Sequence, residues 1–251
     1  MEKVQVSIVT VCFNSEKTIE RTIKSVLNQT YTNLEYVIID GKSSDKTIDI
    51  IKKYEAEFID RDFRYIYISE KDKGMYDAMN KGVKIASGKI IGILNSDDWY
   101  EEQAVEKIVN AYQDNGLGDI FMGAIRIFNG KNIIIKYAKD RKYKTSRNFN
   151  HPAMFVTKEC YKDVGDYGIS NVHDDYGWYL KALKMGKRVV VISDILTNYP
   201  TGGIGSKKDW KSCQVRIITK YQVYRENGYS KIYFVECMMQ EIMKFLLLKS
   251  E

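Results

Sequence analysis

Acidic and amide side chains follow several strand-like segments of the chain, and the run Asn95-Ser96-Asp97-Asp98 is the strongest of these signals. Two adjacent carboxylates placed directly after a buried strand repel each other unless a cation lies beside them. Mg²⁺ and Mn²⁺ use one or two carboxylates and complete their shell with phosphate oxygens and water. The run therefore predicts a divalent metal site with Asp97 and Asp98 as ligands. The alternative is that both aspartates cap a helix beginning near Glu101.

Aromatic and acidic residues follow two earlier strand-like segments. Phe13-Asn14 comes after the first segment, and Asp40-Gly41 comes after the second. A ring such as that of Phe13 can cover one face of a nucleotide base, and a carboxylate such as that of Asp40 can accept a hydrogen bond from a pyrimidine N–H. Asp-Gly is also ordinary turn chemistry, and Asp40 taken alone is better explained as a turn residue.

Familiar nucleotide-binding and nucleic-acid-binding motifs are absent from the sequence. The first strand is followed by CFNSEKTI, which lacks the Gly-x-Gly-x-x-Gly of a dinucleotide fold. Gly41-Lys42-Ser43 resembles the end of a P-loop but leaves no room for a phosphate-cradling loop. Lys and Arg number 39 against 33 Asp and Glu, and the charges alternate in sign. This mild basic excess suits anionic small molecules or an anionic membrane surface, and we expect no nucleic-acid partner.

The composition indicates a globular protein without an evident membrane span. The 251 residues are 44% hydrophobic and 29% charged, which fits one α/β domain with a full core. The four cysteines show no zinc-ligand spacing, so we expect reduced thiols in a cytoplasmic protein. The C-terminal segment Ile232–Leu248 predicts an amphipathic helix. Core packing or a homodimer seam is the expected use of that helix, and peripheral contact with the inner face of the plasma membrane is the alternative.

The first hundred residues alternate strand and helix patterns, which predicts a mostly parallel sheet with helical crossovers. In such sheets, ligands bind beyond the carboxyl ends of the strands. The predicted strands are Val4–Cys12, Glu35–Asp40, Arg64–Ser69 and Lys89–Leu94, and the predicted helices are Glu16–Leu27, Lys46–Tyr54, Met75–Ala86 and Glu101–Tyr112.

Beyond Asp119 the pattern changes. We expect a hairpin, a basic connecting loop, a strand, a helix, a further strand and two C-terminal helices. In that order the first five are Asp119–Phe128 with Asn132–Tyr137, Lys139–Arg147, His151–Val156, Asp174–Met185 and Lys187–Ile192. We interpret residues 1–205 as one transferase domain and residues 206–251 as a helical extension packed on it.

The combination of segments is similar to a known family. SIVTVCFNSEKTIERTIKSVLNQTYTNLEYVIIDGKSSDKT (residues 7–47) and SEKDKGMYDAMNKGVKIASGKIIGILNSDDWY (residues 69–100) resemble the family 2 glycosyltransferases, especially bacterial enzymes that build surface polysaccharides. The resemblance is dense over Val6–Tyr100 and looser to about Gly205. It implies a GT-A fold with a Rossmann-like sheet, a nucleotide-sugar donor and a Mg²⁺ or Mn²⁺ cofactor.

The resemblance also implies donor-side roles at matching positions. Phe13 would lie beside a uracil ring, Asp40 would bind its N–H, and Asp97 would bind the metal with Asp98 next to it. Asp72 would help to seat the nucleoside. The remaining residues that we assign to donor binding are Asn14, Asn95, Ser96 and Gly203.

On the acceptor side, Asp174-Asp175 match an acidic pair of the family, and Asp175 is the better match to the catalytic base. The segment that begins at His151 resembles an acceptor-side loop, although a hydrogen-bonded structural histidine is in general the commoner explanation. His173 adjoins the acidic pair. The expected reaction is a single displacement with inversion. The alternatives are a non-catalytic nucleotide-sugar-binding partner of another transferase and a metal-dependent nucleotidyltransferase.

Three positions depart from the family pattern. Asn95 replaces the first aspartate of Asp-x-Asp, Met79 stands where many members carry an arginine, and Gly177 replaces a frequent acidic residue. A cation for the diphosphate must then come from elsewhere. The basic loop offers the candidates Arg141, Lys142, Lys144 and Arg147.

Overall fold

Four parallel strands form the half of the sheet that carries the N-terminal motifs. In the computed structural model, which describes residues 3–114, 116, 118–201 and 209–247, their order is β3-β2-β1-β4. They are β1 (Val6–Cys12), β2 (Leu34–Asp40), β3 (Arg64–Ser69) and β4 (Ile90–Asn95). The parallel arrangement predicted from the alternating pattern is confirmed.

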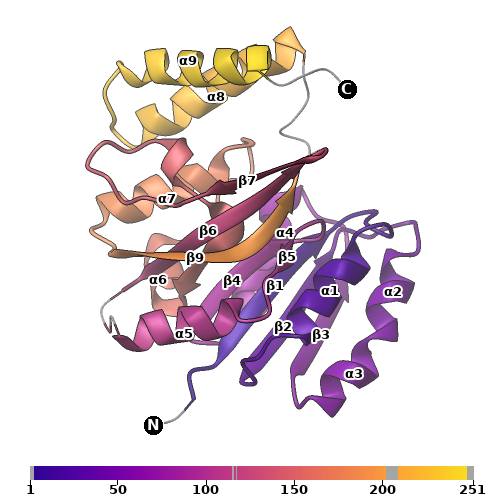
Figure 1. Ribbon diagram of the computed structural model, residues 1–251. Helices are drawn as coiled ribbons and strands as arrows, with labels where there is room; N and C mark the ends of the chain where they lie inside the picture. The colour runs from indigo at the N-terminus through magenta and orange to yellow at the C-terminus, as the bar shows by residue number, and fades with distance from the viewer. Residues whose placement is uncertain (1–2, 115, 117, 202–208, 248–251) are drawn as a thin grey trace.

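The other half of the sheet is mixed (Figure 1). It consists of β8 (Met154–Thr157), β6 (Ile120–Asn129), β9 (Val189–Pro200) and β5 (Trp99–Tyr100), with β7 (Asn132–Lys136) paired to β6 in the predicted hairpin. β8 runs antiparallel to both β4 and β6, whereas β9 runs parallel to β6 and antiparallel to β5. β9 continues to Pro200, well past the predicted end at Ile192, because it pairs along most of the length of β6.

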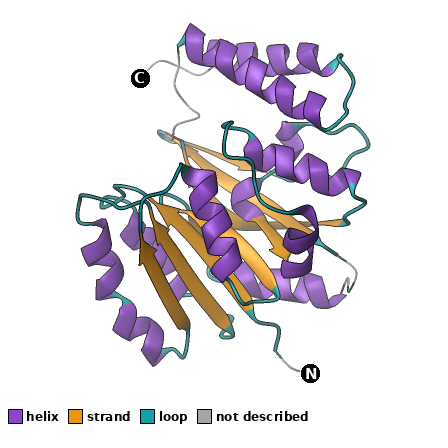
Figure 2. Ribbon diagram, turned by 180° about the vertical axis from the view of Figure 1, so that it is seen from behind, coloured by secondary structure: helices purple, strands orange, loops and turns teal. Residues whose placement is uncertain are grey.

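Helices cover both faces of the sheet (Figure 2). The predicted helices correspond to α1 (Ile19–Leu27), α2 (Thr47–Lys53), α4 (Met75–Ile85), α5 (Ala104–Asp114), α7 (Asp174–Lys184), α8 (Trp210–Glu226) and α9 (Tyr233–Leu247). Two short helices, α3 (Glu55–Asp60) and α6 (Lys158–Val164), are not predicted from the sequence pattern. Single 3₁₀ turns, η1 (Ser146–Asn148) and η2 (His151–Ala153), precede β8, so this strand begins three residues later than expected.

Side chains of each strand alternate between two cores, one on each face of the sheet. In β1, Val9 and Val11 join the core under α4, α6 and α7, whereas Ile8 and Cys12 join the core under α1 and α5. Because both faces are covered, the parallel strands are mostly apolar, and the polar side chains within them, such as Ser7, Thr10 and Glu35, are buried.

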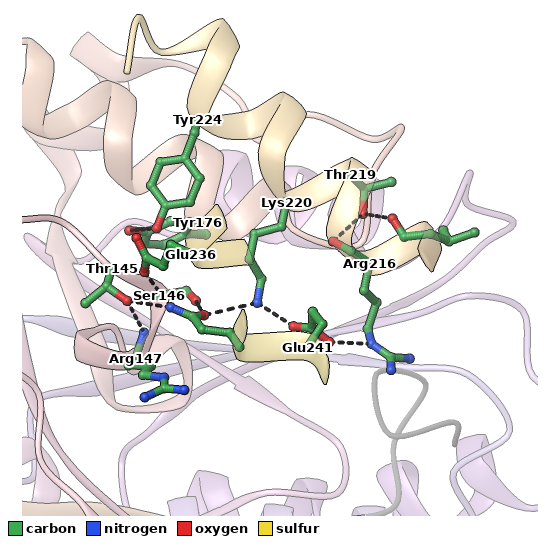
Figure 3. Close-up of polar contacts among 12 residues, drawn as sticks. Thr145, Ser146, Arg147, Tyr176, Arg216, Thr219, Lys220, Tyr224, Glu236 and Glu241 are labelled. Atoms are coloured by element: carbon green, nitrogen blue, oxygen red, sulfur yellow. Dashed lines mark hydrogen bonds and ion pairs between the residues drawn. The ribbon is translucent and has the colours of Figure 1, made fainter. Parts of the chain in front are cut away.

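The C-terminal helices α8 and α9 lie side by side beyond α7 (Figure 1). Three charged residues are buried between them: Glu241 of α9 bonds to Arg216 Nε at 2.8 Å and to Lys220 Nζ at 2.5 Å, both from α8 (Figure 3). Within the described residues, no helix combines the length and the apolar character that crossing a bilayer requires.

Candidate functional site

The parallel register places the ends of the four strands at one edge of the sheet. Cys12 lies beside Asp40, Asp40 beside Ser69, and Val11 beside Asn95. The loops that follow these strands therefore meet there, as expected for an open α/β sheet.

Phe13, Gly41 and Asp72 form one contiguous group at this edge. The Phe13 ring is 62% exposed. A Cβ atom added to Gly41 would lie 3.3 Å from Phe13 Cδ2 and 2.6 Å from Asp72 Oδ2, so only glycine fits between them. Asp72 Oδ1 accepts a hydrogen bond from Gly74 N at 2.9 Å, which fixes the loop that leads into α4. An exposed aromatic ring beside bare backbone and a carboxylate is a surface on which a flat heterocycle can pack.

Asp40 is buried and organises the loop after β2. Its exposed fraction is 1%. Its carboxylate accepts hydrogen bonds from the Ser43 amide at 2.9 Å and the Ser69 hydroxyl at 2.6 Å, and also from the Ser43 hydroxyl. Cys12 Sγ lies 3.6 Å from Asp40 Oδ1, and burial followed by the Asp40 charge raises the pKa of this thiol. The Ser43 side chain thus already donates to one oxygen of Asp40.

Asn14 and Ser15 connect the loop after β1 to two other loops. Asn14 has a left-handed backbone with φ 49°, and its Oδ1 accepts a hydrogen bond from Ser44 N at 2.9 Å. The Ser15 hydroxyl lies 2.8 Å from the Ser96 hydroxyl. The predicted donor-side residues Asn14 and Ser96 are therefore brought together with Asp40 by short polar contacts.

Asn95, Asp97 and Asp98 form a group of buried or half-buried oxygens that lack sufficient donors. Asp98 is fully buried, and within the described chain its Oδ1 and Asn95 Oδ1 have no hydrogen-bond partner. Asp98 Oδ2 has only Asn95 Nδ2, at 3.4 Å. Burial raises the pKa of Asp97, and burial together with the Asp97 charge raises the pKa of Asp98. Such a pair fits a divalent cation, which would favour the ionised carboxylates and use the free oxygens.

Two side chains of helix α1 form hydrogen bonds with the backbone of this acidic segment. Arg21 Nη2 donates to the Asp97 carbonyl at 2.8 Å, and Thr22 Oγ1 donates to the Asp98 carbonyl at 2.6 Å. The Arg21 guanidinium also stacks on the Trp99 ring, 3.7 Å from its centroid. Sequence reasoning did not identify Arg21, because an arginine on a helix 76 residues away from its partner gives no local signal.

The adjacent residues Asp174 and Asp175 have different surroundings. Asp174 Oδ2 accepts hydrogen bonds from the amides of Ser170 and Asn171, each at 2.8 Å, so this carboxylate closes the loop before α7. Asp175 Oδ1 instead accepts a hydrogen bond at 3.1 Å from the hydroxyl of Tyr76, which lies on α4. The predicted acceptor-side role of Asp174 stays a prediction, and its carboxylate is already used within its own loop.

His151, His173 and Lys136 surround Asp175 electrostatically. Burial lowers the pKa of both histidines, and that of His173 falls to about 4 through burial and the nearby Lys220 charge. Burial and Lys220 also lower the pKa of Lys136 to about 8. The negative charge of Asp175 raises the pKa of all three groups, and so partly offsets the effect of burial on each. Both histidines are neutral at pH 7, and in the described structure neither Nε2 atom has a hydrogen-bond partner.

Tyr199 connects the two acidic groups. Trp99 pairs with Asn198 in the β5–β9 ladder, which sets Asp98 next to Tyr199 across the strands. Burial raises the pKa of Tyr199 to about 12, with further contributions from Asp98, Asp97 and Asp175. No hydrogen bond to the Tyr199 hydroxyl occurs within the part of the chain that the structure describes. Sequence reasoning missed this residue because β9 extends further than its pattern indicates.

Other predicted positions lie away from this edge. Met79 is buried in the core under α4. The basic loop packs against α9, with Arg147 Nη2 3.9 Å from Met243 Sδ. Thr145 of the same loop, labelled in Figure 3, accepts a hydrogen bond from Gln240 Nε2 at 2.9 Å. Gly203 lies outside the described residues.

Known proteins resemble this chain in sequence. The profile described as Glycosyl transferase family 2 matches residues 7–161. Chondroitin synthase of Escherichia coli is 33% identical over 189 residues, covering 72% of this chain and 27% of that protein. The uncharacterized glycosyltransferase MJ1057 of Methanocaldococcus jannaschii is 28% identical over 212 residues, covering 79% of this chain and 71% of that protein. The chain thus spans about a quarter of the first relative and most of the second.

Solved structures resemble it in fold. S. aureus TarS 1-349 in complex with UDP has a TM-score of 0.69 at 16% identity, covering 98% of this chain and 72% of that chain. The mannosyltransferase PcManGT from Pyrobaculum calidifontis, in complex with GDP-Man and Mn²⁺, has a TM-score of 0.65 at 15% identity, covering 98% and 71%.

Proposed function

The chain belongs to glycosyl transferase family 2 and has the predicted GT-A fold, and from that premise we propose its reaction. We propose that it moves a sugar from a UDP-sugar onto a hydroxyl of a glycan or lipid-linked glycan, with inversion at the anomeric carbon. The expected role is in bacterial surface polysaccharide synthesis.

One observation carries the proposal. A flat-ring surface at Phe13 and Gly41 shares the carboxyl edge of the sheet with the acidic run, and the β5–β9 ladder sets Asp98 across from Tyr199, whose pKa the charge of Asp175 also raises. A nucleotide, its diphosphate and a proton acceptor can therefore be served by one continuous site.

For the base, we propose uracil packed beside Phe13, with its N–H bonded to Asp40. This requires the Ser43 hydroxyl to leave Asp40, and the base N–H then replaces the donor that was lost. The structural neighbours hold UDP in one case and a guanine nucleotide in the other, so the choice of uracil rests on Phe13 and Asp40.

For the metal, we propose that Asp97 and Asp98 hold Mg²⁺ or Mn²⁺, with Asn95 beside them. The described residues contain no cluster of three or more His, Cys, Asp or Glu able to hold an ion, so phosphate oxygens and water must complete the shell. When bound, the ion would neutralise the negative charge that develops on the leaving diphosphate.

For the chemistry, we propose that Asp175 takes the proton of the acceptor hydroxyl while that oxygen attacks the anomeric carbon. The bond from this carbon to the diphosphate oxygen breaks, and UDP leaves with the electron pair. A positioned general base of this kind contributes about 10²–10⁴-fold to the rate. The attack is a single displacement, so the configuration inverts and no protein nucleophile is required.

Calorimetric titration with UDP, GDP and CMP, each with and without Mn²⁺, tests the donor site. We expect metal-dependent binding of UDP that is lost in Asp40→Ala and Asp97→Ala, while Asp114→Ala, at an exposed residue, binds normally. Preferential binding of GDP would contradict the assignment of Asp40. An absence of nucleotide binding would favour the non-catalytic partner.

Donor hydrolysis in the absence of an acceptor tests catalysis. We expect slow release of UDP from UDP-sugars that Asp175→Asn abolishes, while Asp174→Asn retains it because its carboxylate serves the loop. Release of pyrophosphate from a nucleoside triphosphate and a sugar phosphate would instead indicate a nucleotidyltransferase.

We also propose peripheral contact with an anionic bilayer through α9. Along one stripe of this region, Ile232, Val235, Met239, Met243 and Leu246 are 66%, 48%, 57%, 43% and 72% exposed. The first four of these residues border a groove of about 420 Å³ that also includes Tyr143 and Arg147 of the basic loop. An apolar stripe beside the exposed cation of Arg147 favours negatively charged lipid, and the net charge of +6 adds to that attraction.

Vesicle co-sedimentation tests the membrane contact. We expect binding to vesicles containing phosphatidylglycerol, none to pure phosphatidylcholine, and loss of binding in Met239→Glu. A concentration-dependent dimer that Met239→Glu disrupts, without vesicle binding, would assign the stripe to a homodimer seam. The predicted cytoplasmic location stays a prediction.

A further inference from the structure

Two side chains of α4 hold the segment that leads to Asp175. Tyr76 and Asn80 are four residues apart and share one helix face. Asn80 Nδ2 donates to the Tyr167 carbonyl at 2.9 Å, and Asn80 Oδ1 accepts from the Tyr167 amide at 2.8 Å. Asn80 is 7% exposed, so its amide satisfies both backbone groups of Tyr167 in a buried position. The loop before α7 is thereby fixed to α4.

Tyr76 reaches the end of the same segment. Its hydroxyl lies 2.9 Å from the Val172 carbonyl and 3.1 Å from Asp175 Oδ1, and its single hydrogen is shared between them. The Tyr76 ring is 7% exposed and stacks on Tyr167 with centroids 6.1 Å apart. Burial, followed by the Asp175 charge, raises the pKa of Tyr76, so the phenol remains a donor.

The two carboxylate oxygens of Asp175 differ in their hydrogen bonds. Oδ1 accepts from Tyr76 and from the Tyr176 amide at 2.7 Å. Within the described residues, no hydrogen bond to Oδ2 occurs, and Oδ2 is not among the buried atoms without a partner. This asymmetry suits a general base, because one oxygen is held in place and the other is free to accept a proton.

We infer that Tyr76 is a positioning residue for Asp175, and that α4 fixes the base relative to the donor loop. The inference rests on the proposed function. Helix α4 begins directly after Gly74, whose amide is held by Asp72 beside Gly41. The loop at the nucleotide surface and the hydroxyl that holds Asp175 are therefore attached to the first turn of one helix.

A matched variant separates positioning from general stability. Tyr161 belongs to the same buried aromatic group as Tyr76, and its hydroxyl lies 2.9 Å from the Tyr167 hydroxyl. Tyr161→Phe removes a buried hydroxyl from this group without touching Asp175. Both Tyr76→Phe and Tyr161→Phe keep the ring and its packing, so their stabilities can be compared directly.

The experiment measures acceptor-free hydrolysis of the UDP-sugar that the wild-type protein hydrolyses fastest. We expect Tyr76→Phe to lower kcat about 10-fold with KM and UDP affinity unchanged, and Tyr161→Phe to stay within about twofold. Equal loss in the two variants, or a wild-type kcat in Tyr76→Phe, overturns the inference. If Asp175→Asn keeps full turnover, Asp175 is not the base, and the proposed function fails together with the inference. If Asp175→Asn is inactive but Tyr76→Phe has the wild-type kcat, Asp175 remains the proposed base and the positioning role of Tyr76 is wrong.

Discussion

Neighbouring residues with the same chemistry have different hydrogen-bond partners in the candidate site. Asp174 and Asp175 lie in the first turn of α7, where successive side chains differ in direction by about 100°. One closes its own loop and the other meets Tyr76. The sequence indicates that an acidic pair is present. Which member of the pair contacts α4 is not visible in the sequence, because its partner, Tyr76, lies 99 residues earlier in the chain than Asp175.

The variant Tyr199→Phe tests whether the acidic run Asn95–Asp98 and Asp175 belong to one site. Burial, followed by the charges of Asp98, Asp97 and Asp175, raises the pKa of this hydroxyl, and it has no hydrogen-bond partner in the described residues. We expect the Tyr199 hydroxyl to donate a hydrogen bond to the bound UDP-sugar. Its removal should therefore lower kcat/KM for UDP-sugar hydrolysis about 10-fold. Tyr31→Phe removes a hydroxyl bonded to the Val4 carbonyl at the amino end of the strands, and should leave kcat/KM unchanged. Equal activity of both variants would exclude Tyr199 from the site.

Among the elements, long periodic segments could be predicted and short ones could not. β3 has the predicted bounds, and α4 is predicted to within one residue, because their patterns are uninterrupted. β5 has two residues and exists only because it pairs with β9. α6 begins directly after β8, whose last residue, Thr157, accepts from Cys160 N at 3.2 Å through its Oγ1, so no loop separates the two elements. Elements of this kind are determined by tertiary contacts.

The packing of α8 against α9 depends on the buried Glu241. This residue is 3% exposed and lies between two cations, so Glu241→Gln leaves Arg216 and Lys220 without its charge. We expect a loss of about 3–5 kcal/mol in the free energy of unfolding at pH 7. Urea titration measures it, with the exposed Glu226→Gln as control.

The pH dependence of this difference has a defined sign. Burial alone would raise the pKa of Glu241, but Lys220 and Arg216 outweigh burial and lower the value from 4.5 to about 2. The stabilisation is therefore present above pH 4.5 and is lost as the pH falls towards 2, where the folded wild-type protein is also protonated. The difference between wild type and Glu241→Gln should shrink over that interval. A difference independent of pH would show that packing, and not charge, is responsible.

In the whole molecule, the site is assembled from segments that only the fold brings together. The parallel register could be predicted, and with it the meeting of Phe13, Asp40 and the acidic run at one edge. The order β4-β8-β6-β9 could not, because it joins segments far apart in the chain. The same holds for the basic loop, which the sequence suggests as a source of cations for the diphosphate. Its Arg147 instead contacts Met243, because α9 folds back over the loop.

The stability of the whole protein should respond to a divalent cation before any substrate is bound. Burial raises the pKa of Asp97 and Asp98, so their ionised forms oppose folding at neutral pH, and this opposition disappears as falling pH protonates them. A cation held only by the folded state adds about 2.7 kcal/mol at a concentration 100 times its Kd. We therefore expect Mn²⁺ to raise Tm at pH 7.5 and to have less effect as the pH falls, because protons compete for the same oxygens. Asp97→Asn should abolish the shift and Asp114→Asn should retain it; an equal shift in both variants would mean that the cation binds elsewhere.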